Sequence, residues 1–124
     1  MPVMTEQNRL NDFLKWEEDV MYSREKGTVA SGNSITLGEV LGKVTATGKY
    51  VPLNTGASDG SESAAAIALA DIDASTADAE GPVLVREAIV VDGGLVWPEG
   101  ITSGDKTTAQ GQLEALGIIF REEA

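Results

Sequence analysis

Residues 35–53 have the sequence ITLGEVLGKVTATGKYVPL, and the rest of the chain is interpreted around them. Across residues 40–47, small or apolar residues alternate with mostly polar ones. This period of two is typical of a half-buried strand and not of a helix. Gly48 then interrupts the alternation with a residue that tolerates positive φ, and Tyr50 begins a second β-prone segment. The stretch therefore predicts a β-hairpin.

Glycine and proline positions refine this hairpin. Gly38 and Gly42 stand at the two ends of a three-residue segment, so we expect the first strand to bend or bulge there. Pro52 has no backbone N–H to donate, which restricts it to a sheet edge or a strand end. Gly38, Gly42 and Gly48 are accordingly predicted to be structural residues.

More strands are expected downstream of the hairpin. Residues 64–72 carry seven consecutive apolar residues between turn-forming segments, which favours a buried strand over a helix here. Residues 75–82 are predicted to form a loop, and residues 83–91 form the strongest β-prone run of the chain. An Asp-Gly-Gly sequence at residues 92–94 predicts a tight reversal into a strand at residues 95–97.

The C-terminal part predicts one helix followed by a last strand. Pro98 ends the preceding strand, and Trp97 before it is expected to be buried in the body. Thr102 and the acidic residue three positions later have the spacing of a capping box. Gly117 stands where a residue with positive φ commonly ends a helix, and residues 118–120 are predicted to form the last strand.

The N-terminal residues predict an extension to the single domain that a chain of 124 residues would form. Leu10, Phe13 and Leu14 have helical spacing, and such a short amphipathic helix would be stable only when docked. Residues 20–30 suit an edge strand or an extended arm. A frayed terminus is the alternative, but Phe13 and Trp16 favour an arm that becomes ordered on a partner.

Composition excludes several classes of function. The chain contains no cysteine and no histidine, which removes thiolate chemistry and the usual neutral-pH acid-base group. A net charge of −11 is repelled by nucleic acid and by anionic lipid, so we expect neither partner. No secretory signal or membrane-spanning run is visible, so the chain is expected to remain in a cytoplasm or to assemble there. Few aromatic residues and many small ones predict a small core, and oligomerisation would bury more surface.

Short motifs that resemble catalytic or metal-binding signatures are each incomplete. A segment resembling a phosphate-binding loop has Val44 where a magnesium-binding Ser or Thr is needed. Asn54 replaces the aspartate that an aspartic protease requires. Asp71 and Asp73 could begin a calcium loop, but the later ligands of such a loop are missing. We therefore predict no catalytic residue, no metal site and no cofactor.

The order of these pieces is distinctive when taken together. In order, the segments are Leu37-Gly38, Val40-Leu41-Gly42, Thr47-Gly48-Lys49-Tyr50-Val51, Ala57-Ser58-Asp59-Gly60, an Ala-rich strand, Val83-Leu84-Val85-Arg86, Leu95-Val96-Trp97-Pro98-Glu99-Gly100 and a terminal helix. With these segments, the chain resembles the head decoration proteins of tailed bacteriophages, of the lambda protein D type, over about residues 20–121.

The resemblance implies a fold and a function. The expected fold class is α+β and mostly β, with β-clip-like hairpins and one C-terminal helix in a body of residues 31–124. Residues 1–30 would be a capsid-binding arm that adds a strand to a sheet of the major capsid (coat) protein. The protein would be a homotrimer that binds the outside of the expanded head at three-fold sites and stabilises it, without enzymatic activity. It would be located on the exterior of the phage head after assembly in the host cytoplasm.

Main-chain pairing of this arm would give affinity, and its alternate side chains would give register. The residues expected to contact the capsid are Phe13, Trp16, Val20, Tyr22 and Arg24. The residues expected to be structural are Gly38, Gly42, Gly48, Trp97, Pro98, Thr102 and Gly117.

Two other functions remain open at this point. A small trimeric β-rich accessory phage hydrolase that uses carboxylates would need two acidic side chains converging in a pocket. Asp71 and Asp73 are the sequence's nearest approach to such a pair. A scaffold or chaperone that leaves the particle is the third interpretation.

Overall fold

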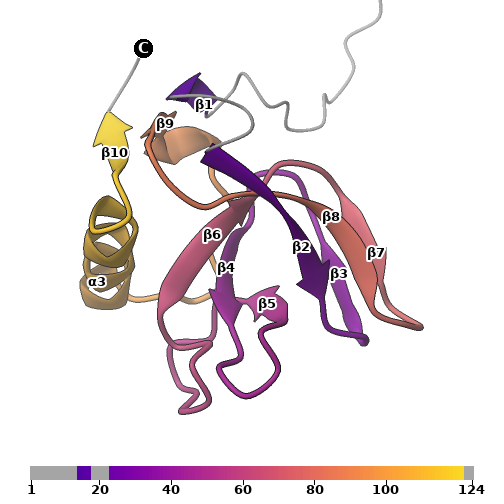
Figure 1. Cartoon of the computed structure of the whole chain (residues 1–124). Helices are drawn as coiled ribbons and strands as arrows, with labels where there is room; N and C mark the ends of the chain where they lie inside the picture. Colours follow the sequence, from indigo (N-terminus) through magenta and orange to yellow (C-terminus); the bar gives the residue numbers. More distant parts are fainter. Residues whose placement is uncertain (1–13, 18–22, 122–124) are drawn as a thin grey trace, which may run out of the picture.

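The computed structural model describes residues 14–17 and 23–121. Five strands of this part of the chain form a closed barrel (Figure 1). Around the barrel the strands follow the order β2 (Arg24–Val29), β5 (Tyr50–Pro52), β4 (Val40–Lys43), β6 (Ala64–Ala68) and β8 (Ala79–Leu84). The chain is therefore mostly β, as its alternating segments predict.

The predicted hairpin is confirmed as β4 and β5, which pair antiparallel from Leu41 opposite Pro52 to Lys43 opposite Tyr50. Gly48 has a φ of 70° in the connecting turn. The pairing of β4 with β6 shifts register between Leu41 and Gly42, which is the expected irregularity. Pro52 is the last residue of its strand, so its missing N–H leaves no gap inside the ladder.

The barrel closes unevenly. β2 runs antiparallel to β8 along its whole length, from Arg24 opposite Leu84 to Val29 opposite Ala79. On its other side β2 meets β5 at a single pair, Val29 opposite Tyr50. Beside the barrel, β3 (Asn33–Ile35) and β7 (Ile72–Ala74) form a separate two-stranded antiparallel ribbon. A buried cluster that includes Val29, Ile35 and Ile72 joins the ribbon to the barrel.

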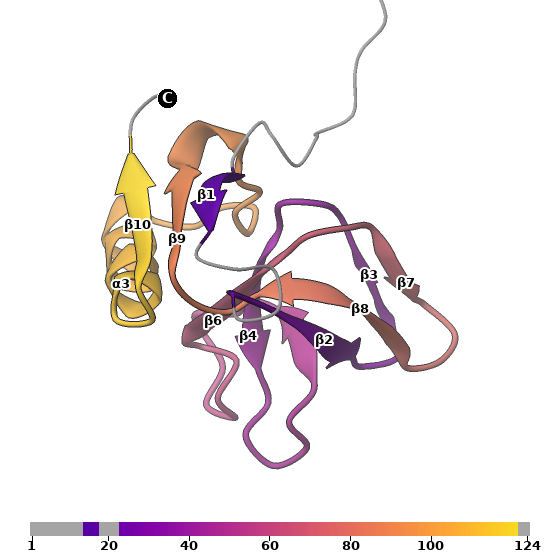
Figure 2. The same cartoon turned by 45° about the horizontal axis from the view of Figure 1, so that its top comes forward.

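A second, smaller sheet has the strand order β1 (Leu14–Glu17), β9 (Ala88–Val91) and β10 (Ile118–Arg121). β1 is antiparallel to β9, whereas β10 is parallel to it. Parallel neighbours need a crossover connection. Here that connection contains the short 3₁₀ turn η1 (Asp92–Gly94) and the helix α3 (Ser103–Glu114). Figure 2 shows β10, β9 and β1 side by side, with α3 behind β10.

The inner face of this sheet is buried against α3 and against one side of the barrel. Leu14, Val90 and Ile118 from the three strands lie in one apolar cluster with Leu113 of α3 and Leu84 of the barrel. The cluster makes the sheet and the barrel parts of one core, and the C-terminal helix of the expected fold class is confirmed.

Three predicted elements are wrong in detail. Residues 83–91 do not form one strand, because the chain leaves the barrel after Leu84 and joins the small sheet at Ala88. Ala79–Leu84 is a strand although residues 75–82 were expected to be a loop, since pairing with β2 overrides the low β-propensity of Gly81 and Pro82. Of residues 95–97, Val96 makes only an isolated bridge to Glu39, not a strand of a hairpin.

The N-terminal segment also differs from expectation where the structure describes it. Leu14–Glu17 is a strand and not the end of an amphipathic helix, because its backbone pairs with β9. Arg24–Val29 belongs to the closed barrel, although residues 1–30 were expected to lie outside the body. Phe13, Val20 and Tyr22 lie outside the described residues, so their predicted roles stay predictions.

Candidate functional site

The small sheet places Trp16 on the surface by means of a β-bulge. Leu14 is opposite Val90 but Trp16 is opposite Ile89, so one extra residue lies in β1 between these pairs. Without it, Leu14 and Trp16 would face the same side of the sheet. Leu14 is instead buried, with 9% of its surface exposed, whereas Trp16 is 47% exposed. Trp16 is thus presented to solvent, as a residue expected to contact a partner should be.

Arg24, another residue of the expected arm, is occupied within the molecule. Its Nε lies 2.9 Å from Oε2 of Glu17 and its Nη2 lies 2.7 Å from Oε1, a two-point ion pair. The hydrogen bond from Arg24 to Glu17 raises the pKa of the guanidinium further. This geometry is stronger than a single-point contact. Arg24 therefore fastens β1 to the start of β2 in the protein as it stands.

Ser23 holds the segment that leads from β8 of the barrel to β9 of the small sheet. Nothing in the sequence indicated this role. Ser23 is fully buried, its hydroxyl donates to the carbonyl of Glu87 at 2.9 Å, and its own carbonyl accepts from the N–H of Val85. Glu87 has a φ of 47°, an uncommon conformation for a residue with a side chain. These hydrogen bonds satisfy the polar groups at a point where no sheet ladder can.

Gly117 shares this junction. Its φ is 87°, and a Cβ atom there would collide with the carboxylate of Glu87. The carbonyl of Gly117 accepts from the N–H of Ala88, at the start of β9. The predicted structural role of Gly117 thus has a physical basis in addition to ending the helix. Gly42 has a similar constraint, because a Cβ atom there would collide with the backbone of Ser61.

The remaining predicted structural residues occupy turns and packing positions. Gly38 has a φ of 88° in the turn before β4. Thr102 is the N-cap of α3, and its Oγ1 accepts from the N–H of Asp105 at 3.1 Å. Trp97 is half-buried and stacks on Phe120 of β10, with ring centroids 6.4 Å apart. Pro98 begins a turn that closes with a hydrogen bond from the N–H of Ile101.

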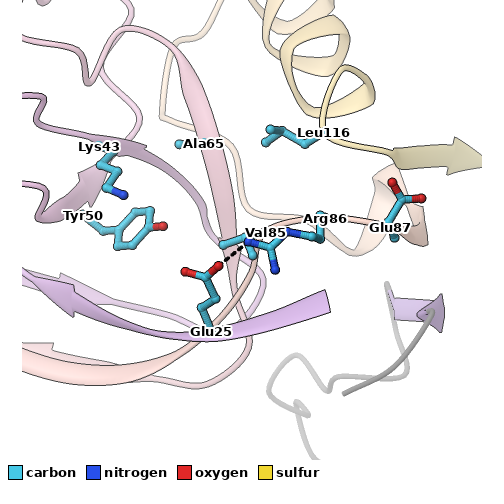
Figure 3. A pocket seen from close by; sticks show the side chains of 8 residues that line it. All are labelled: Glu25, Lys43, Tyr50, Ala65, Val85, Arg86, Glu87 and Leu116. Atoms are coloured by element: carbon cyan, nitrogen blue, oxygen red, sulfur yellow. Dashed lines mark hydrogen bonds and ion pairs between the residues drawn. The ribbon is translucent and has the colours of Figure 1, made fainter. Parts of the chain in front are cut away.

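An open pocket of about 390 Å³ lies between the barrel and the end of α3 (Figure 3). Its charged groups are engaged with neighbours: Arg86 forms an ion pair with Glu25, and the Nζ of Lys43 lies 5.4 Å from the ring centroid of Tyr50. Burial raises the pKa of the Tyr50 hydroxyl, and the charge of Glu25 raises it further. The lining residues are Glu25, Lys43, Tyr50, Ala65, Val85, Arg86, Glu87 and Leu116.

Asp71 and Asp73 do not converge on a shared site; they hold separate turns. Asp71 accepts from the N–H of Leu37 at 2.8 Å, and Asp73 accepts from the hydroxyl and the N–H of Ser75. Across residues 14–17 and 23–121, no group of three or more acidic side chains is arranged to hold a metal ion. The two aspartates therefore accept hydrogen bonds from different segments, Asp71 from Leu37 and Asp73 from Ser75.

Comparison with models of known protein families identifies one matching family. The model of the bacteriophage lambda head decoration protein D family matches residues 3–118, nearly the whole chain. The chain belongs to this family. Among curated proteins, no sequence matches the chain.

This head decoration protein accordingly decorates the phage capsid and is a component of the virion head. Its family is one of structural proteins and is not known as an enzyme family. In the part of the chain that the structure describes, no helix has the length and apolar character to cross a membrane.

Some residues of the site carried no sequence signal. Ser23 and Glu87 are 64 positions apart, and Glu17 and Arg24 belong to different sheets, so nothing in the local pattern pairs them. Trp16 could be selected because it is one of the few aromatic residues of the chain and lies in a polar segment. The bulge that exposes it depends on the register with β9 and could not be anticipated.

Proposed function

We propose that the protein is a homotrimeric cementing protein that binds the outside of the expanded phage head at its three-fold sites and stabilises the shell. The observation that carries this proposal is the family match over residues 3–118, because members of this family decorate the head. Head decoration requires contact with the coat protein, which is the expected partner.

The arm is proposed to make the first part of that contact. Phe13, Trp16, Val20, Tyr22 and Arg24 remain the proposed contact residues within residues 1–30. Because β1 and β2 are paired with strands of the body, Trp16 and Arg24 would meet the shell from paired strands, whereas residues 1–13 precede the first pair. Three arms acting together would bind about 10²–10⁴-fold more tightly than one, which is the physical advantage of a trimer.

The proposal is tested by mixing the purified protein with undecorated expanded shells. We expect sedimentation to show a trimer in solution and binding to saturate at three copies per three-fold site. We also expect filled shells to withstand mechanical or chemical rupture that breaks empty ones. A protein that stayed monomeric and left the shells undecorated would contradict the proposal.

The protein composition of the mature particle distinguishes a cementing protein from a scaffold or chaperone. A cementing protein remains in purified mature heads, whereas a scaffold is missing from them.

A further inference from the structure

The outer face of the small sheet carries a row of three apolar side chains. In the register of the sheet, Trp16 of β1 is opposite Ile89 of β9, and Ile119 of β10 is level with Ile89 on the other side. Residues paired in this way share one face of a sheet. Ile89 is half-buried, and Trp16 and Ile119 are 47% and 50% exposed. We call these three residues the outer row.

Folding does not require this row to be apolar. The opposite face of the same strands supplies Leu14, Val90 and Ile118 to the core shared with α3. The alternation of a strand would allow polar residues on the outer face of such a sheet. Trp16 and Ile119 instead have the largest exposed fractions among the large apolar side chains of the described residues.

The bulge in β1 is what brings Trp16 into the outer row. A regular β1 would turn Trp16 into the same face as Leu14, and the row would lose its aromatic member. Bulges recur where a strand must re-aim a side chain for function. The exposure of Trp16 is thus a result of the register that the chain adopts.

We propose that the outer row docks directly on the coat-protein shell, as a second contact of the body beside the arm. This inference rests on the proposed function and names the surface by which the body, and not only the arm, meets the shell. The partner surface would be a shallow apolar patch of the coat protein. β1 begins at Leu14, two residues before Trp16, so an arm formed by residues 1–13 that bound the shell would hold the row close to it.

The size of the row favours the shell over a second copy of this chain. Three partly exposed side chains offer on the order of 200–300 Å², since even a large aromatic side chain buries only about 150–250 Å². A stable interface between two proteins needs roughly 800 Å² from each partner. The row is too small to hold copies together by itself, but a tethered contact needs far less area because the arm already raises the effective concentration.

The test compares Ile119→Thr with Val96→Thr. Both changes replace an exposed β-branched apolar residue by a β-branched polar one, and Val96, 37% exposed, is bridged to Glu39 and not part of the small sheet. Affinity for undecorated expanded shells is measured for the full-length proteins, with sedimentation and urea unfolding on the same samples. We expect Ile119→Thr to bind at least about fivefold more weakly, given the apolar area lost. Val96→Thr should bind as the wild type does.

Each other outcome overturns the inference. Unchanged binding by Ile119→Thr means that the row does not touch the shell, and loss of the trimer means that the row lies between copies. If Ile119→Thr does not fold, Trp16→Thr in the edge strand decides by the same criteria. If the wild-type protein does not bind the shells, the proposed function itself is refuted. The wild-type measurement alone shows this, without the variants.

Discussion

At the level of single residues, Trp97 joins parts of the C-terminal half of the chain, because its ring contacts side chains of both α3 and β10. Its ring stacks on Phe120 at an interplanar angle of 29°, and the Nζ of Lys106 in α3 lies 5.3 Å from its centroid. The side chain is half-buried and packs against the main apolar cluster. Trp97 therefore connects the segment after β9 with both the helix and the last strand.

Replacing Trp97 by alanine should destabilise the protein by about 2–3 kcal/mol. This is less than the roughly 3–5 kcal/mol typical of a fully buried aromatic residue, because part of the ring is already in water. Urea unfolding with a tryptophan-independent signal measures the change. Trp97→Phe, which retains a stacked ring, should lose less than half as much. An unchanged midpoint for Trp97→Ala would show that the ring does not stabilise the body.

The sequence identifies residues whose role depends only on positions adjacent to them in the chain. Thr102 and Gly48 were predicted because capping and turn chemistry depend on a few adjacent positions. Ser23 was not, because a lone serine between a polar segment and a strand has no feature that marks it as buried. Its role comes from Glu87, which reaches it only through the tertiary fold.

At the level of elements, β1 is held to the body by a few identifiable attachments. It is short, it is an edge of the small sheet, and its attachments are pairing with β9, the burial of Leu14 and the ion pair between Glu17 and Arg24. The barrel strands have neighbours on both sides. Deleting the segment before β1 leaves each of these attachments in place.

Deleting residues 1–13 should leave a folded trimer with the same urea midpoint, but shell binding should weaken by about 10² or more as three tethered contacts are lost together. The deletion stops before Leu14, because removing residues through β2 would also open the barrel. Removing residues 122–124, which follow β10 in the sequence, is the control and should preserve binding. Saturation of the shells by the shorter protein would contradict the proposed arm.

The elements themselves were predictable where one pattern continues without interruption. The hairpin of β4 and β5, the strand β6 and the helix α3 were all identified from period, turn residues and a cap. The break between β8 and β9 was missed, since residues 83–91 have one unbroken β-prone composition. What divides them is the conformation of Glu87, fixed by hydrogen bonds from Ser23 and to Leu116. Such a break depends on tertiary contacts, which composition does not contain.

Considered as a whole molecule, the protein holds its surface loops with carboxylates. Asp59, Asp73 and Asp78 each have a pKa below the usual 3.8. The cause is hydrogen bonding to the ionised form, from the Ser61 hydroxyl, the Ser75 hydroxyl and Lys49 respectively. All three side chains are exposed, so each contribution is modest.

These shifts predict how stability depends on pH. A carboxylate with a lower pKa in the folded state stabilises it fully above the unfolded pKa of 3.8, and this stabilisation is lost as the pH falls through the folded pKa. The urea midpoint should therefore decrease between about pH 5 and about pH 2. A variant with Asp59→Asn, Asp73→Asn and Asp78→Asn should show a flatter profile over this range. An equally steep profile in the variant would assign the acid sensitivity to other groups.

The buried hydroxyl of Ser23 also limits how far the chain's leading end can extend. Residues 1–13, fully stretched, span at most roughly 45 Å, at about 3.3–3.6 Å per residue. If β1 were peeled from its neighbour, nine more residues would be freed and would add roughly 30 Å, up to the anchor at Ser23. The ion pair between Glu17 and Arg24 helps to hold β1 on the body, and so favours the shorter of these two reaches.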